Sequence, residues 1–200
     1  MSDYIFLFDL DSTITCKEIL PEISKKIGKY DEMRQMTEAS MCGEIPFHAS
    51  LINRVKIVSE IPVSEVKQIV SELPLNRNIA NFIRENKKRC YIITGSLDIY
   101  ISDLMKNLKM ENHCYCSKAE VENDKVSKII NVIDKELMVR QFVQPMVVVG
   151  DGDNDSGMAH MADIAIGFGG VRPVAKSLLR NSDFVFYDDK RCAEFLWKLL

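Results

Sequence analysis

The sequence lacks the marks of a membrane protein and of a secreted protein held together by disulfides. Of its 200 residues 46% are hydrophobic, yet no apolar run approaches the roughly 20 residues that span a bilayer. The six cysteines are scattered rather than paired, a usage typical of free thiols in a reducing compartment. Met1 leads almost directly into an apolar strand instead of a cleavable signal. These absences predict a cytoplasmic protein with no membrane partner.

The sequence also lacks a surplus of positive charge and any cluster of histidines. The net charge is −3 and the basic residues are dispersed, so we expect no nucleic-acid partner. His48, His113 and His160 have no spacing that indicates a ligand set or a triad. Cys114 and Cys116 near His113 are too few for zinc, which takes about four ligands. A small molecule is the predicted partner, and the composition gives no prediction of the oligomeric state.

The order of apolar segments predicts an α/β fold. Short, continuously apolar strands follow one another, each separated from the next by a helical pattern, as is typical of a parallel sheet covered on both faces. The first predicted strand ends at Phe8, where the DLDST turn begins, and the others are 90–94, 113–116, 146–150, 163–168 and 183–187, with one of the intervening helices near 125–141. The fold class that follows is a doubly wound parallel sheet, which binds ligands at the carboxyl ends of its strands.

Residues 17–73 interrupt this alternation, because they contain only helical patterns. Ile19, Leu20 and Ile23 recur at helical spacing, and so do Val66 and Val70 further along. We therefore predict a small all-helical cap, residues 16–74, inserted after strand one of a core formed by residues 1–15 and 75–200.

Three predicted strands end in polar, acidic or glycine-containing turns: DLDST after the first strand, TGS at 94–96 and GDGDND at 150–155. Asp9 and Asp11 share one face of an extended chain, where two carboxylates repel unless a cation or a shared proton lies between them. The third turn adds Asp151, Asp153 and Asp155 to the same edge of the sheet. So many carboxylates favour a hard cation, and we predict Mg²⁺ because the run lacks the length and final Glu of a calcium loop.

In this order, FDLDST, ITGS and GDGDND resemble the motifs of the haloacid dehalogenase (HAD) superfamily. Within that superfamily the sequence is most similar to the phosphoserine phosphatases. Glu18 follows the first motif at the position of their substrate-binding Glu, and the stretch 39–55 carries Met41, Phe47 and Arg54 at matching positions. The resemblance implies a HAD-like Rossmannoid core and a Mg²⁺-dependent phosphatase that acts on a small phosphorylated metabolite.

The resemblance also implies roles for the acidic residues. Asp9 is expected to attack phosphorus and become an aspartyl-phosphate, while Asp11 protonates the leaving alkoxide and later accepts a proton from water. The implied metal ligands are Asp9, Asp11 through its backbone carbonyl, and Asp151, with Asp155 in the outer shell. Mg²⁺ is the implied cofactor.

One catalytic lysine is implied as well, and four lysines compete for the role: Lys118, Lys125, Lys128 and Lys135. An ungapped count back from GDGDND places Lys128 at the family position, near the start of the helix predicted there. We therefore assign Lys128 to catalysis and phosphate binding, and keep Lys125 in reserve.

The remaining residues that the resemblance singles out concern the substrate. Glu18 is expected to bind an ammonium and Arg54 a carboxylate, with Met41 and Phe47 shielding the pocket. The expected phosphate and substrate contacts are completed by Thr94, Gly95, Ser96, Asn154 and Lys128.

Three departures from the family pattern bear on the substrate. Ser96 stands where a second glycine is common, Asp153 adds a charge, and the stretch 116–125 implies a shortened hairpin. Other substrates therefore stay open: phosphoethanolamine, phosphohomoserine or a sugar phosphate. Transfer of the phosphoryl group to an alcohol also stays open, and so does a non-catalytic module phosphorylated on Asp9.

Overall fold

The computed structural model describes residues 3–200, so residues 1 and 2 of the predicted core lie outside it. Its central strand, β1 (Ile5–Phe8), is buried on both faces. Phe6 and Phe8 belong to one hydrophobic cluster, and Ile5 and Leu7 belong to the other. Because successive side chains of a strand point to opposite faces, a tetrapeptide with four apolar residues must lie inside the sheet.

Within residues 3–200 the strands form one seven-stranded sheet in the order β4-β3-β2-β1-β5-β6-β7. All neighbours pair in parallel except β3 and β4, which are antiparallel. The other strands are β2 (Cys90–Leu97), β3 (Cys114–Glu122), β4 (Lys125–Asn131), β5 (Met146–Gly150), β6 (Ile164–Phe168) and β7 (Phe184–Phe186). The predicted doubly wound α/β fold is confirmed.

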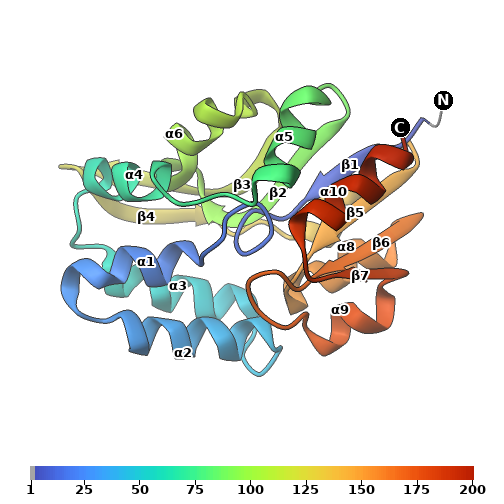
Figure 1. Ribbon diagram of the computed structural model, residues 1–200. Helices are drawn as coiled ribbons and strands as arrows, with labels where there is room; N and C mark the ends of the chain where they lie inside the picture. Colours follow the sequence, from blue (N-terminus) through green and yellow to red (C-terminus); the bar gives the residue numbers. More distant parts are fainter. Residues whose placement is uncertain (1–2) are drawn as a thin grey trace.

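Helices cover both faces of this sheet (Figure 1). One face carries α5 (Arg77–Glu85), α6 (Asp98–Leu108) and α10 (Asp189–Lys198). The other carries α7 (Lys135–Val139), α8 (Ser156–His160) and α9 (Lys176–Asn181). Short 3₁₀ turns occur at Lys25–Ile27, Glu111–His113 and Asp153–Asp155. Among the described residues, no helix combines the length and apolarity that crossing a membrane requires.

The segment between β1 and β2 is helical, as predicted, and contains α1 (Ile19–Ser24), α2 (Tyr30–Met41), α3 (Phe47–Val58) and α4 (Val63–Ser71). Helices α1, α2 and α3 form a layer of their own, whereas α4 lies beside α6 and β4 (Figure 1). Extensive contacts join α4 to α6. The division into a core and a cap of residues 16–74 stays a prediction, because the last of these helices packs on the core.

A two-residue turn between β3 and β4 holds α4 in place. Asn123 and Asp124 have φ angles of 50° and 61°, the left-handed conformations that two-residue hairpin turns require. The Asp124 carboxylate accepts hydrogen bonds from the Ser64 backbone N–H at 3.0 Å and the Ser64 hydroxyl at 2.5 Å. The Val63 N–H donates to the Asp124 carbonyl at 2.7 Å. The hairpin therefore supplies the cap that the first turn of α4 needs.

Asp124→Ala is expected to lower the melting temperature by about 2–4 °C, because the first turn of α4 loses its capping carboxylate. Asp124→Gly is the matched variant, since glycine adopts the left-handed conformation without strain and removes only the cap. Thermal unfolding by circular dichroism measures both. An Asp124→Gly variant with an unchanged melting temperature would show that the cap contributes nothing.

The hairpin also corrects two expectations. The helix predicted near 125–141 is wrong over its first half, because residues 125–131 form β4 and helix α7 begins only at Lys135. The third strand, predicted at 113–116, continues to Glu122. The physical reason is the Asn123–Asp124 turn, which lets β3 fold back and pair with β4.

Candidate active site

The site lies at the carboxyl ends of β1, β2 and β5. Strand β1 has β2 on one side and β5 on the other, so the loops after these strands meet where the direction of winding changes. Asp9 follows β1 directly, and its N–H donates to the Val149 carbonyl of β5 at 2.9 Å. Asp151 follows β5 directly. The register of the sheet thus brings two distant acidic motifs together, as the sequence predicts.

Three buried carboxylates form a group that can hold a cation. Asp9, Asp151 and Asp155 each offer an oxygen, and these oxygens lie within 4.8 Å of one another. Burial raises the pKa of Asp9 well above its usual value and that of Asp151 to about 7. Crowded, desolvated carboxylates are stabilised by a cation, and an all-oxygen donor set fits Mg²⁺. The donor chemistry of the predicted ligands Asp9, Asp151 and Asp155 therefore suits the predicted cofactor.

Lys135, not Lys128, is the lysine of this site. Its ammonium contacts the Asp9 carboxylate and lies 2.6 Å from Asp155 Oδ1. Burial lowers the pKa of Lys135, but Asp155 and Asp9 outweigh this effect and hold that pKa above the ordinary lysine value. Lys128 is exposed on β4 opposite Glu120. The structure thus corrects the assignment of Lys128 to catalysis and phosphate binding, for the reason that β4 carries this residue away from the strand ends.

Lys125, kept in reserve, and Lys118, another lysine considered for the role, are not in the site either. Lys125 pairs with Glu60 at the hairpin, and Lys118 lies 3.4 Å from Asp98. Two signals in the sequence indicate the right lysine. The Asn-Asp pair at 123–124 is typical of a hairpin turn, and Asp134 is a helix N-cap whose side chain accepts from the Leu137 N–H at 3.0 Å.

Asp155 organises the third acidic turn. Its Oδ2 accepts hydrogen bonds from the backbone N–H groups of Asp151 at 3.0 Å and Gly152 at 2.9 Å. A side chain at Gly150 would collide with the Asp155 carboxyl, with 2.6 Å between its Cβ and Asp155 Cγ. Asp155 therefore fixes the loop that carries Asp151 and also contacts Lys135, as expected of an outer-shell carboxylate.

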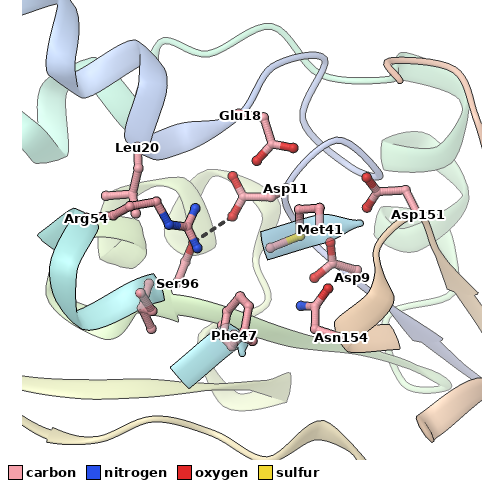
Figure 2. A pocket seen from close by; sticks show the side chains of 12 residues that line it. Asp9, Asp11, Glu18, Leu20, Met41, Phe47, Arg54, Ser96, Asp151 and Asn154 are labelled. Carbon is pink, nitrogen blue, oxygen red and sulfur yellow. Dashed lines mark hydrogen bonds between the residues drawn. The ribbon is translucent and has the colours of Figure 1, made fainter. Parts of the chain in front are cut away.

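The side chain of Asp11 is turned away from the carboxylates of Asp9 and Asp151 (Figure 2), and Asp11 is not part of the cluster that could hold a cation. Its Oδ1 accepts from the Ile19 N–H at 2.7 Å, and its Oδ2 accepts from the Ser96 hydroxyl at 2.7 Å. Burial raises the pKa of Asp11, and the hydrogen bonds from Ser96 and Ile19 act in the opposite direction. Both Asp11 oxygens thus have partners outside the cluster. Ser96, one of the departures from the family pattern, is its direct partner.

A small cavity of about 30 Å³, here called the inner cavity, lies between these groups. Asp9 and Asp11 line it together with Glu18 and Arg54, which come from the insertion (Figure 2). The lining is completed by Leu20, Met41, Phe47, Leu51, Gly95, Ser96, Asp151 and Asn154. Of the predicted substrate residues, Thr94 and Lys128 do not line it. The Thr94 hydroxyl instead accepts the Ser96 N–H at 3.1 Å, within the irregular end of β2.

Glu18 and Arg54 approach the inner cavity from different helices. Glu18 is the N-cap residue of α1 and accepts a hydrogen bond from the Ser12 hydroxyl at 2.8 Å. Arg54 is buried on α3, where its Nη1 donates to the Thr37 hydroxyl at 2.9 Å. Burial raises the pKa of Glu18 and lowers that of Arg54. An acid and a guanidinium thus flank one small space, as predicted.

The insertion closes tightly over the core at two glycines. A Cβ atom on Gly95 would overlap the ring of Phe47 from α3. A Cβ atom on Gly152 would lie 2.9 Å from the sulfur of Met41 at the end of α2. Met41 and Phe47 therefore cover the inner cavity, and they can pack this closely because Gly95 and Gly152 have no side chains.

Arg172 was not predicted, yet it bridges Asp151 and Glu18. Its Nε lies 2.5 Å from Asp151 Oδ2 and 3.3 Å from Glu18 Oε1. Arg172 also lines a second, larger cavity of about 460 Å³, here called the outer cavity, which shares Glu18 with the inner one. The signal in the sequence is a basic residue in the loop after β6, at the carboxyl edge of the sheet.

Comparison with known proteins agrees with this site. The sequence model of the haloacid dehalogenase-like hydrolase family matches residues 6–160, which include the three acidic or glycine-containing turns. The chain belongs to this family. The predicted resemblance and the prediction of an enzyme of the hydrolase class are confirmed.

Curated relatives of this HAD-like hydrolase are named phosphoserine phosphatase. One from Archaeoglobus fulgidus is 28% identical over 88% of this chain and 54% of its own, so the chain spans about half of that relative. One from Methanocaldococcus jannaschii is 24% identical over 96% of this chain and 95% of its own. These relatives and the family match support the prediction of a phosphoric monoester hydrolase.

Solved structures share the fold of this HAD-like hydrolase. A substrate-bound phosphoserine phosphatase superposes with a TM-score of 0.84 at 21% identity, covering 100% of this chain and 99% of that one. A phospho-aspartyl intermediate analogue of phosphoserine phosphatase gives 0.83 at 21% identity, covering 97% and 98%. At this level of identity the likeness establishes the fold.

Proposed function

We propose that the protein is a Mg²⁺-dependent phosphoserine phosphatase that works through an aspartyl-phosphate on Asp9. The observation that carries the proposal is the lining of the inner cavity, where Asp9 and Asp11 meet Glu18 and Arg54. The first pair suits transfer of a phosphoryl group, and the second pair complements an ammonium and a carboxylate. Free phosphoserine carries all three groups.

The clustered carboxylates would hold the cofactor. Asp9, Asp151 and Asp155 are the candidate side chains, and the predicted contribution of Asp11 is its backbone carbonyl. A bound Mg²⁺ would shield the charge of Asp9 from that of the phosphate and polarise the phosphoryl oxygens. Arg172 and the N–H groups around Asp155 keep Asp151 oriented for this role.

In the first step a carboxylate oxygen of Asp9 attacks phosphorus and the bond from phosphorus to the serine oxygen breaks. Asp11 gives its proton to the departing alkoxide, so serine leaves as a neutral alcohol. The raised pKa of Asp11, caused by its burial, favours the protonated form that this step uses. Contact with Lys135 holds the Asp9 carboxylate in place.

In the second step water attacks the phosphorus of the aspartyl-phosphate and gives its proton to Asp11. The bond between phosphorus and the Asp9 oxygen breaks, which releases inorganic phosphate and restores both carboxyl groups. Lys135 remains close to the oxygens on which charge develops.

A phosphate-release screen with and without Mg²⁺ tests the proposal. Phosphoserine is expected to be the best substrate of a panel that includes phosphoethanolamine, phosphohomoserine, sugar phosphates and an aryl phosphate, and chelation is expected to abolish turnover. Phosphoethanolamine lacks the carboxylate that Arg54 would bind, so a preference for it would contradict the assignment of Arg54.

Arg54→Ala is expected to lower kcat/KM for phosphoserine by about 100-fold, because a buried guanidinium that pairs with a substrate carboxylate contributes about 2–5 kcal/mol. Turnover of an aryl phosphate, which has no carboxylate, should fall much less. Arg34→Ala is the matched control, since Arg34 pairs with Glu38 on α2 and does not line the inner cavity. Equal losses for both substrates would assign Arg54 to structure rather than to recognition.

A further inference from the structure

On one edge of the Arg172 guanidinium, only one of the two nitrogen atoms has a hydrogen-bond partner. Its Nε lies 2.5 Å from Asp151 Oδ2, whereas its Nη2 is buried and has no hydrogen-bond partner among the described residues. Nε and Nη2 project parallel N–H groups from one edge of the guanidinium, the fork that binds two neighbouring oxygens. The acceptor that would complete this fork lies beside the Asp151 carboxylate.

The unpartnered nitrogen is directed at the loop that carries the phosphate-binding candidates. Arg172 Nη2 and Asn154 Oδ1 both lie within 3.0 Å of the position that a Cβ atom on Gly152 would occupy. The Asn154 oxygen is likewise buried without a partner. Asn154 lines the inner cavity, and the lack of a side chain at Gly152 lets Arg172 Nη2 and Asn154 Oδ1 approach the same point. Two unsatisfied polar groups at one point indicate a polar ligand there.

An anion that enters the inner cavity needs a cation to offset the carboxylates around it. A phosphate dianion must enter beside five carboxylates, namely Asp9, Asp11, Glu18, Asp151 and Asp155. The ammonium of Lys135 is already shared by Asp9 and Asp155. Arg172 adds a cation whose Nη2 has no partner among the described residues and can donate to a further oxygen.

We propose that Arg172 is a further substrate-binding residue, which donates its Nη2 to a phosphate oxygen while its Nε stays on Asp151. The inference rests on the proposed function for the chemical class of its ligand, a phosphomonoester dianion. Because Arg172 also contacts Glu18, it links the acid that recognises the substrate to the acid that binds metal.

The test is calorimetric titration of inorganic phosphate into the enzyme at saturating Mg²⁺. Arg172→Ala is expected to weaken phosphate binding by about 10-fold or more, as the loss of a charged hydrogen bond does. Arg172→Lys keeps the charge but loses the fork, and it is expected to bind phosphate almost as weakly. If the alanine variant does not fold, phosphate binding by Arg172→Lys tests the proposal on its own. Arg34→Ala, the other arginine of the outer cavity, should bind like wild type.

A separate titration of Mg²⁺ distinguishes binding from positioning. If Arg172 only orients Asp151, its variants will bind Mg²⁺ more weakly but bind phosphate like wild type once Mg²⁺ is saturating, and this result overturns the inference. Failure of the proposed function looks different. In that case wild type binds inorganic phosphate through Arg172 yet releases none from phosphoserine.

Discussion

Asp9→Asn is expected to reduce kcat by about 10⁴-fold or more, because the amide cannot act as the nucleophile and no neighbouring carboxylate can replace it. Asp155 is occupied by backbone N–H groups and Lys135, and Asp11 faces Ile19 and Ser96. The substitution is nearly isosteric, so circular dichroism should show a folded protein. Phosphate release from phosphoserine under saturating Mg²⁺ measures the effect.

Asp11→Asn is the informative companion, since it keeps the nucleophile and removes the proton donor. With an aryl phosphate, whose leaving group needs no proton, Asp9 should still be phosphorylated and hydrolysis should then stall. Mass spectrometry of acid-quenched protein is expected to show a phosphate adduct on Asp9 that wild type does not accumulate. Substantial turnover by Asp9→Asn would refute the covalent route altogether.

Lys135→Met is expected to lower kcat by about 10³-fold, the scale of losing a preorganised charge next to the transferring group. It should also destabilise the fold by about 3–5 kcal/mol without Mg²⁺, because buried Asp9 and Asp155 lose their shared partner. Mg²⁺ should restore part of this stability by binding the same carboxylates. Thermal unfolding with and without Mg²⁺ measures the second effect independently of turnover.

Lys128→Met is the matched control for that experiment. Lys128 is exposed on β4, so its substitution is expected to leave kcat within about twofold of wild type and the melting temperature nearly unchanged. The opposite outcome would be a lower kcat for Lys128→Met and an unchanged kcat for Lys135→Met. It would support Lys128 as the catalytic lysine, as the ungapped count along the sequence predicts.

The acidic residues could be placed from the sequence because each follows its own strand directly. A short apolar strand and the polar turn after it are contiguous in the sequence. The positions of Asp9 and Asp151 could therefore be predicted from the rule that the carboxyl ends of parallel strands lie at one edge of the sheet. Glu18, Met41, Phe47 and Arg54 were identified by resemblance, and the structure brings all four to the inner cavity.

Lys135 and Arg172 could not be placed in the same way, because neither residue directly follows a strand that ends at the site. The position of Lys135 depends on where β4 ends, which the Asn123–Asp124 turn determines through pairing with β3. Arg172 lies in the loop after β6, and its ion pairs with Glu18 and Asp151 join residues that are far apart in the chain. Tertiary packing therefore decides which of several similar cations enters a buried site.

The anchoring of α4 to the hairpin divides the insertion into two parts, one that lines the inner cavity and one that packs on the core. Every insertion residue that lines the inner cavity precedes α4: Glu18, Leu20, Met41, Phe47, Leu51 and Arg54. Helix α4 lines neither cavity and is held by Asp124 and α6. We therefore expect the segment from α1 to α3 to tolerate exchange better than α4 does. A relative's equivalent segment could be grafted onto this core to change the substrate while the catalytic acids and the anchor stay as they are.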